Sequence, residues 1–139
     1  MTGRRSKLSK KRDFLIYVVD DEKIIATTVA AILRQSGLQA LAFTDPREAL
    51  TSAHSNPPDL LLTDVVMPEL SGIDLALQLR EISPNSKILL FSGQAATSDM
   101  LEVARQQGHE FKILSKPIHP ADLLAAISAQ QVPTSGEKP

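Results

Sequence analysis

The 139-residue sequence contains no cysteine and no tryptophan, and its only aromatic residues are one tyrosine and four phenylalanines. The absence of cysteine excludes a disulfide framework, a thiolate zinc site and a cysteine nucleophile. No apolar run approaches the length needed to cross a bilayer, and the run at 14–19 is too short for the core of a signal peptide. We therefore expect a cytoplasmic protein with no membrane partner.

Acidic and basic residues are unevenly distributed along the chain. The formal net charge is −1, but the first twelve residues contain six basic residues and no acidic one, which leaves −7 for the rest. The basic residues are Arg4, Arg5, Lys7, Lys10, Lys11 and Arg12. Because nucleic-acid-binding domains usually carry a basic surface, the acidic remainder argues against a nucleic-acid partner for the folded part. We expect a disordered basic tail at 1–12, one folded domain at 13–131 and a disordered tail at 132–139.

Short apolar stretches alternate with stretches of helical periodicity. The predicted strands lie at 14–19, 38–43, 60–64, 88–91 and 111–114. The predicted helices lie at about 23–36, 46–54, 72–82, 100–107 and from 120 onwards. Asp45 before Pro46, and Ser71 three residues before Asp74, are typical of helix starts. The alternation predicts a doubly wound α/β domain, in which helices cover both faces of a five-stranded parallel sheet.

Polar residues follow most of the predicted strands. Asp20 and Asp21 follow the first strand, Asp64 ends the third, Ser92 follows the fourth and Lys116 comes shortly after the fifth. Ligands bind beyond the carboxyl ends of the strands in such sheets, so these side chains are expected to meet at one edge. Each residue alone could be a helix-end acid, a turn residue or a solvated charge. Their joint occurrence at the strand ends favours a functional site.

The residue types at this edge suggest phosphoryl chemistry. Carboxylates that converge without partners repel one another, so the arrangement predicts a cation among them. Oxygen ligands without histidine or cysteine favour Mg²⁺, which also binds substrate phosphate. Asp64, on the central strand, is the candidate nucleophile, because a carboxylate can attack phosphorus to form an aspartyl-phosphate. Lys116 and the metal would neutralise charge during transfer, and Ser92 would donate to a phosphoryl oxygen.

These residues resemble the receiver domain of bacterial two-component response regulators. The likeness covers roughly 14–130 and rests on the acid pair, on Asp64 in the motif DVVMPELSG, on Ser92 and on Lys116 before Pro117. It implies a flavodoxin-like (βα)5 fold with strand order 2-1-3-4-5. It also implies a cis peptide before Pro117, and a sensor histidine kinase or phosphotransfer protein that donates a phosphoryl group to Asp64.

The resemblance implies a set of metal ligands as well. Mg²⁺ would be held by Asp21, by Asp64, by the backbone carbonyl of Val66 and, through water, by Asp20. Val66 and Gln94 are expected to flank the entry to the site. Because the apolar Val66 cannot orient an attacking water molecule, we predict slow self-dephosphorylation.

A conformational switch is a further implication. In the family, phosphorylation draws the hydroxyl of Ser92 inward, and an aromatic residue three positions before Lys116 rotates. This movement remodels the face formed by the last two helices and the strand between them, which could also support a homodimer. Here Ile113 occupies that position, the segment from Gly108 to Lys116 is one residue longer than usual, and Phe111 is out of register. The hydroxyl half of the switch can act without the aromatic residue.

Three functions remain open. The leading one is a receiver that is not an enzyme towards other substrates, that carries no DNA-binding output domain and that signals to an unknown protein target. A phosphatase-like enzyme would use Asp64 on external phosphoesters, but it would be expected to carry a carboxylate where Val66 stands. The third is an adaptor whose basic tail binds nucleic acid or a membrane surface. The histidines, His54, His109 and His119, are interpreted as surface residues and not as metal ligands.

Overall fold

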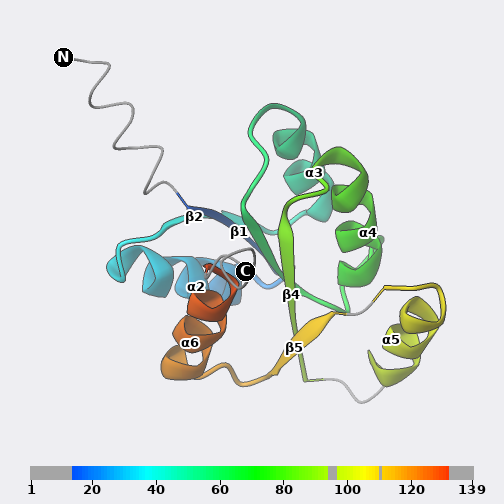
Figure 1. Ribbon diagram of the computed structural model, residues 1–139. Coiled ribbons are helices and arrows are strands. Elements are labelled where there is room, and N and C mark those ends of the chain that lie inside the picture. Colours follow the sequence, from blue (N-terminus) through cyan, green and yellow to red (C-terminus); the bar gives the residue numbers. More distant parts are fainter. Residues whose placement is uncertain (1–13, 94–96, 110, 132–139) are drawn as a thin grey trace, which may run out of the picture.

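The computed structural model describes residues 14–93, 97–109 and 111–131, except for the side chains of 97 and 98. The predicted tails and Gln94 lie outside these residues. The strands are β1 (Leu15–Val19), β2 (Gln39–Phe43), β3 (Leu60–Asp64), β4 (Lys87–Ser92) and β5 (Lys112–Ser115). The helices are α2 (Lys23–Gln35), α3 (Pro46–Ser55), α4 (Gly72–Ile82), α5 (Thr97–Gln106) and α6 (Pro120–Gln131). All paired strands are parallel, in the order β2-β1-β3-β4-β5 (Figure 1), which confirms the predicted fold class.

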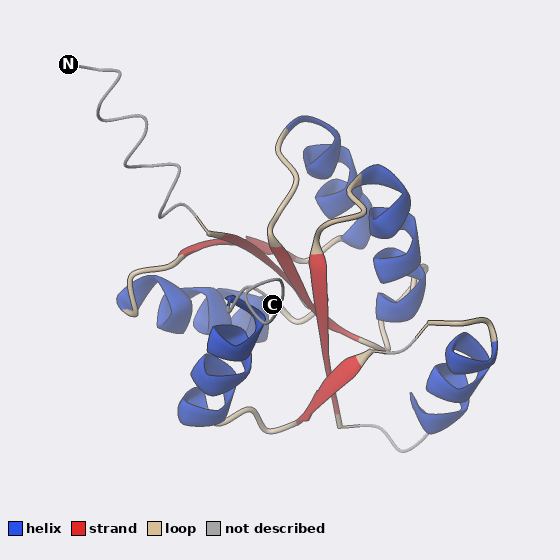
Figure 2. Ribbon diagram, in the orientation of Figure 1, coloured by secondary structure: helices blue, strands red, loops and turns tan. Residues whose placement is uncertain are grey.

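Two helical layers enclose the sheet (Figure 2). One face packs against α3, α4 and α5, and the other packs against α2 and α6. Successive residues of a strand point to opposite faces, so Leu61 belongs to the first core and Leu62 to the second. All five residues of β3 are buried, because β3 is the middle strand and is covered on both sides.

Local sequence signals set most of the element boundaries. The side chain of Asp45 accepts a hydrogen bond from the Arg47 amide at 2.9 Å, and Ser71 Oγ accepts one from the Asp74 amide at 3.1 Å. These caps start α3 and α4 as predicted. Gly37 follows α2 with a φ of 89°, a conformation that glycine adopts without steric cost.

Four of the five strands differ from the prediction by one residue at one or both ends. β1 and β2 each start one residue later than predicted. β4 is longer at both ends than 88–91, because its parallel ladder with β3 begins at Lys87. β5 starts one residue later than 111 and includes Ser115, since its pairing with β4 runs from Lys112 to Ser115. Phe111 therefore lies outside the strand and packs against the first core. This shift places the aromatic ring on the α4 side of the sheet.

Candidate functional site

The carboxyl ends of the parallel strands bring the predicted polar residues to one edge of the sheet. The residue after β1, Asp20, and the last residue of β3, Asp64, lie on neighbouring strands. Carboxylate oxygens of Asp20, Asp21 and Asp64 all lie within 4.8 Å of one another. The topology has thus brought Asp64 beside two adjacent acids that lie more than forty residues earlier in the sequence.

Asp64 is held at the centre of this edge. Only 7% of the residue is exposed, one carboxylate oxygen accepts a hydrogen bond from the Val65 amide at 2.9 Å, and the other lies 3.4 Å from Lys116 Nζ. Burial and the neighbouring charge of Asp20 raise the pKa of the Asp64 carboxyl above its usual value, although Lys116 and the amide act in the opposite direction. The ionised carboxylate is therefore less stabilised than it would be in water.

Lys116 links the acids on β1 and β3. Its Nζ donates to Asp20 Oδ2 at 3.2 Å, and its backbone amide donates to the Ser92 carbonyl at 3.1 Å. Burial alone would lower the pKa of the Lys116 ammonium, but the charges of Asp20 and Asp64 outweigh it and raise that pKa. The peptide bond from Lys116 to Pro117 is cis, as predicted. A charged lysine consequently stands beside the buried acids.

The donor set fits a divalent cation. Three carboxylates face one ammonium, so the cluster carries excess negative charge that a cation would compensate. Asp20 is fully buried and its second oxygen accepts from the Glu22 amide at 2.8 Å, whereas Asp21 is exposed. The cluster therefore offers carboxylate oxygens to a hard metal ion from the solvent side.

The loop after β3 is fixed by a close backbone approach at Gly72. The amide of Gly72 donates to the Val65 carbonyl at 2.8 Å, and a Cβ atom at this position would overlap the carbonyl oxygen of Asp64. The motif DVVMPELSG contains this glycine, but the sequence did not reveal the reason for it. Glu69, with a φ of 71°, pairs with Arg47 of α3 at 2.8 Å and ties the same loop to the helical layer.

The other predicted site residues differ in where the structure places them. Ser92 is buried at the end of β4, and Val66 is 44% exposed two residues beyond Asp64. Gln94 lies outside the described residues. Ile113 is 40% exposed on β5, so it does not occupy a core position.

The Phe111 ring contacts two residues that the sequence did not identify as site residues. The Arg80 guanidinium carbon lies 4.7 Å from the centre of the Phe111 ring. Arg80 Nη1 lies 3.1 Å from His109 Nδ1, and the His109 and Phe111 rings stack with centres 6.4 Å apart. His109 is half-buried, which corrects its interpretation as a simple surface residue. Arg80 on α4 and Phe111 are distant in the sequence, so no local pattern could have joined them.

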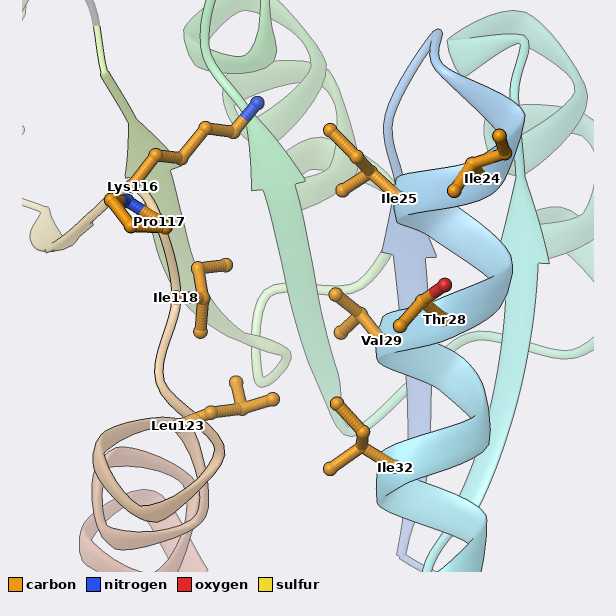
Figure 3. Close-up of a pocket in the computed structure, with 9 residues that line it drawn as sticks. All are labelled: Ile24, Ile25, Thr28, Val29, Ile32, Lys116, Pro117, Ile118 and Leu123. Atoms are coloured by element: carbon orange, nitrogen blue, oxygen red, sulfur yellow. The ribbon is translucent and has the colours of Figure 1, made fainter.

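A groove of about 510 Å³ runs between α2 and α6 next to the acidic cluster (Figure 3). In Figure 3, Ile25, Val29 and Ile32 of α2 face Ile118 and Leu123 across the groove. Lys116 lies at one end. The groove is thus apolar along its length and reaches the charged site.

Comparisons with known proteins agree with this geometry. The family model described as "Response regulator receiver domain" matches residues 16–128. The response regulator receiver protein CpdR of Brucella abortus is 34% identical over 112 residues, covering 81% of this chain and 92% of CpdR. The chemotaxis protein CheY of Thermotoga maritima is 26% identical over 114 residues, covering 81% and 93%. A receiver domain structure from Clostridium thermocellum has a TM-score of 0.74 and 30% identity, covering 84% of this chain and 92% of that one.

The fold, the acidic edge and these relatives define a signalling domain of the two-component type. The chain belongs to the response regulator receiver domain family. It spans about half the length of several other relatives, such as the transcriptional regulatory protein PhoP of Bacillus subtilis, where it covers 47%. Within the described residues, no helix is both long and apolar enough to cross a membrane.

Proposed function

We propose that Asp64 accepts a phosphoryl group from a sensor histidine kinase or a phosphotransfer protein. The observation that carries this proposal is the position of Asp64. It lies at the end of the central strand, in contact with Lys116 and within 4.8 Å of two further carboxylates. In the transfer, an Asp64 carboxylate oxygen attacks phosphorus and a P–O bond forms. The bond from phosphorus to the donor histidine breaks, and its electron pair leaves with the imidazole nitrogen.

Mg²⁺ is the cation that we assign to the cluster, with Asp20, Asp21 and Asp64 as the side chains that would hold it and the Val66 carbonyl as a further ligand. When bound, the metal supplies positive charge that offsets the charge of the phosphoryl oxygens. Lys116 can exchange its contact with Asp64 for a phosphoryl oxygen, since its ammonium is mobile and stays charged. The hydroxyl of Ser92 would donate to another phosphoryl oxygen. These shifts would alter the face formed by α5, β5 and α6, which we assign to the downstream target or to a second copy of the chain.

The first experiment is the intact mass of the protein after incubation with a small-molecule phosphodonor and Mg²⁺. We expect one phosphoryl adduct in the native chain, which disappears when Mg²⁺ is removed and in Asp64→Asn. Val66 has no group that could position a water molecule or act as a general base for hydrolysis of the adduct. We therefore expect the adduct to persist for about minutes or longer. A half-life of seconds would contradict the role of Val66, and an unmodified native chain would contradict the whole proposal.

We assign the groove between α2 and α6 as the docking site of the phosphodonor protein. A donor must present its histidine directly to Asp64, and Lys116 joins the end of the groove to that carboxylate. Ile24, which is 79% exposed, stands at the edge of the groove without a core role. An apolar helix face of the donor would bury it.

Ile24→Asp tests this docking surface. We expect transfer from the cognate donor protein to fall about tenfold, the loss of roughly 1.4 kcal/mol that one interface residue can cause. Modification by the small-molecule donor should be unchanged, because Ile24 does not touch the acids. Val103→Asp is the matched control, since Val103 is a similarly exposed apolar residue on α5. Equal losses with Ile24→Asp and the control would place the donor elsewhere.

The two alternative functions have weaker support. An enzyme acting on external phosphoesters would need a general acid, and Val66 stands where the second carboxylate is expected. The adaptor function depends on the basic segment at 1–12. Deleting that segment and measuring the salt dependence of nucleic-acid and vesicle binding would test it.

A further inference from the structure

We propose that Arg80, His109 and Phe111 form a clasp that couples the phosphorylation site to the β5 face in this chain. The inference rests on the proposed phosphorylation of Asp64. It is motivated by the position three residues before Lys116, where Ile113 is 40% exposed and no aromatic ring is available to rotate. Another contact must therefore restrain β5 if its position is to depend on Asp64.

The clasp joins two segments through three mutual contacts. Arg80 lies in the last turn of α4, whereas His109 and Phe111 lie in the connection that leads to β5. The guanidinium stands over the Phe111 ring at 4.7 Å and approaches His109 Nδ1 at 3.1 Å, while the two rings are nearly parallel at 11°. A planar guanidinium can make the ring contact and the hydrogen bond together, which a lysine cannot.

One side of the clasp leads back to Asp64 through α4. The first residue of α4, Gly72, donates to the Val65 carbonyl and leaves no room for a Cβ atom beside the Asp64 carbonyl. A helix is a stiff rod, and eleven residues of α helix span about 15 Å. Movement of the acceptor peptide would consequently be carried along α4 to Arg80.

The other side leads back to Asp64 through β5. Phe111 immediately precedes the strand, and Lys116 immediately follows it. Lys116 contacts both Asp20 and Asp64 through its ammonium. The start of α4 and the end of β5 therefore both lie near Asp64. The end of α4 and the start of β5 are joined by the clasp. With its first end tied to Phe111, β5 can respond to a changed charge on Asp64 as a unit.

Hydrogen exchange tests the clasp in the full chain. Exchange of the peptides covering β5 and α5 is measured with and without Mg²⁺ and beryllofluoride, a phosphoryl analogue that also activates the receiver domain of DrrB. We expect the analogue to change exchange in the native chain, and this change to fall to less than half in Arg80→Ala and in Phe111→Leu. Because both variants open the same contact, the double variant should add little further loss. Arg80→Lys, which keeps the charge but not the planar group, should lose most of the response.

The controls separate this proposal from phosphorylation itself and from a purely structural role. Every variant should still form the phosphoryl adduct, since none of the clasp residues touches the acids. Arg34 lies on α2, on the other face of the sheet, and its guanidinium donates hydrogen bonds to the Ala40 carbonyl. The control variant Arg34→Ala removes this guanidinium and should keep the full exchange response. A full response in Arg80→Ala, with the adduct formed, would overturn the clasp alone. A native chain that takes neither the adduct nor the analogue would overturn both proposals.

Discussion

The acidic edge and the β5 side of the molecule are built in different ways. Asp20 and Asp64 lie at the ends of the inner strands β1 and β3, in which every residue except the partly buried Leu15 is buried. β5 is an edge strand, and three of its four residues are exposed. A packed interior holds charged groups in fixed positions, whereas an exposed edge can move at low cost. The proposed switch needs both properties, because it requires a preorganised site and an output surface with two arrangements.

Glycine substitutions should give the largest difference in stability between the two regions. Gly72→Ala places a Cβ atom against the Asp64 carbonyl, and we expect the free energy of unfolding to fall by about 2 to 3 kcal/mol, the upper part of the range for steric insertion. Gly108→Ala is the matched control near β5. Its φ of 93° disfavours alanine, but no atom lies within 4 Å of the new Cβ atom, so we expect a loss of about 1 kcal/mol.

Urea unfolding of both variants would measure the difference, and intact mass would follow the adduct. Gly72→Ala should also lose phosphorylation, because the acceptor peptide must shift, whereas Gly108→Ala should retain it. Equal losses of stability would mean that the loop at Gly72 yields easily. The proposed contrast between a rigid acidic site and a deformable β5 side would then be wrong.

Removing the charge of Asp64 should have a smaller effect, of opposite sign. The pKa of this acid is raised in the folded state above its unfolded value of about 3.9, so its favourable contribution is complete below that value and is lost as the pH rises through the folded pKa. At neutral pH the ionised carboxylate therefore destabilises the fold. We expect Asp64→Asn to unfold at a higher urea concentration than the native chain at pH 7, with the gap closing as the pH falls towards 3.9.

Two controls sharpen that measurement. Asp122→Asn, on the exposed side of α6, should leave the free energy of unfolding within about 0.5 kcal/mol of the native value. Added Mg²⁺ should stabilise the native chain more than Asp64→Asn, because the ion binds only where the acids converge. A variant less stable than the native chain at pH 7 would show that the contact with Lys116 outweighs burial.

The sequence determined the edge of the sheet that carries the site. Apolar runs fixed the strands, and parallel strands with right-handed crossovers must end at a common edge, so Asp20, Asp64 and Lys116 could be predicted to meet. Helix starts at Asp45 and Ser71 were equally local, since a cap needs only the next three residues. The strand order came from the resemblance to receiver domains, because the periodicity of each segment says nothing about its neighbours.

Tertiary structure decided how the edge is supported. The need for glycine at position 72 follows from its approach to a carbonyl eight residues earlier, and the place of Phe111 follows from Arg80 on another element. Such contacts depend on where whole helices and strands pack, and local propensity does not encode that. The sequence alone therefore specified which residues carry the charge at the site, while packing specified what holds them and what moves with them.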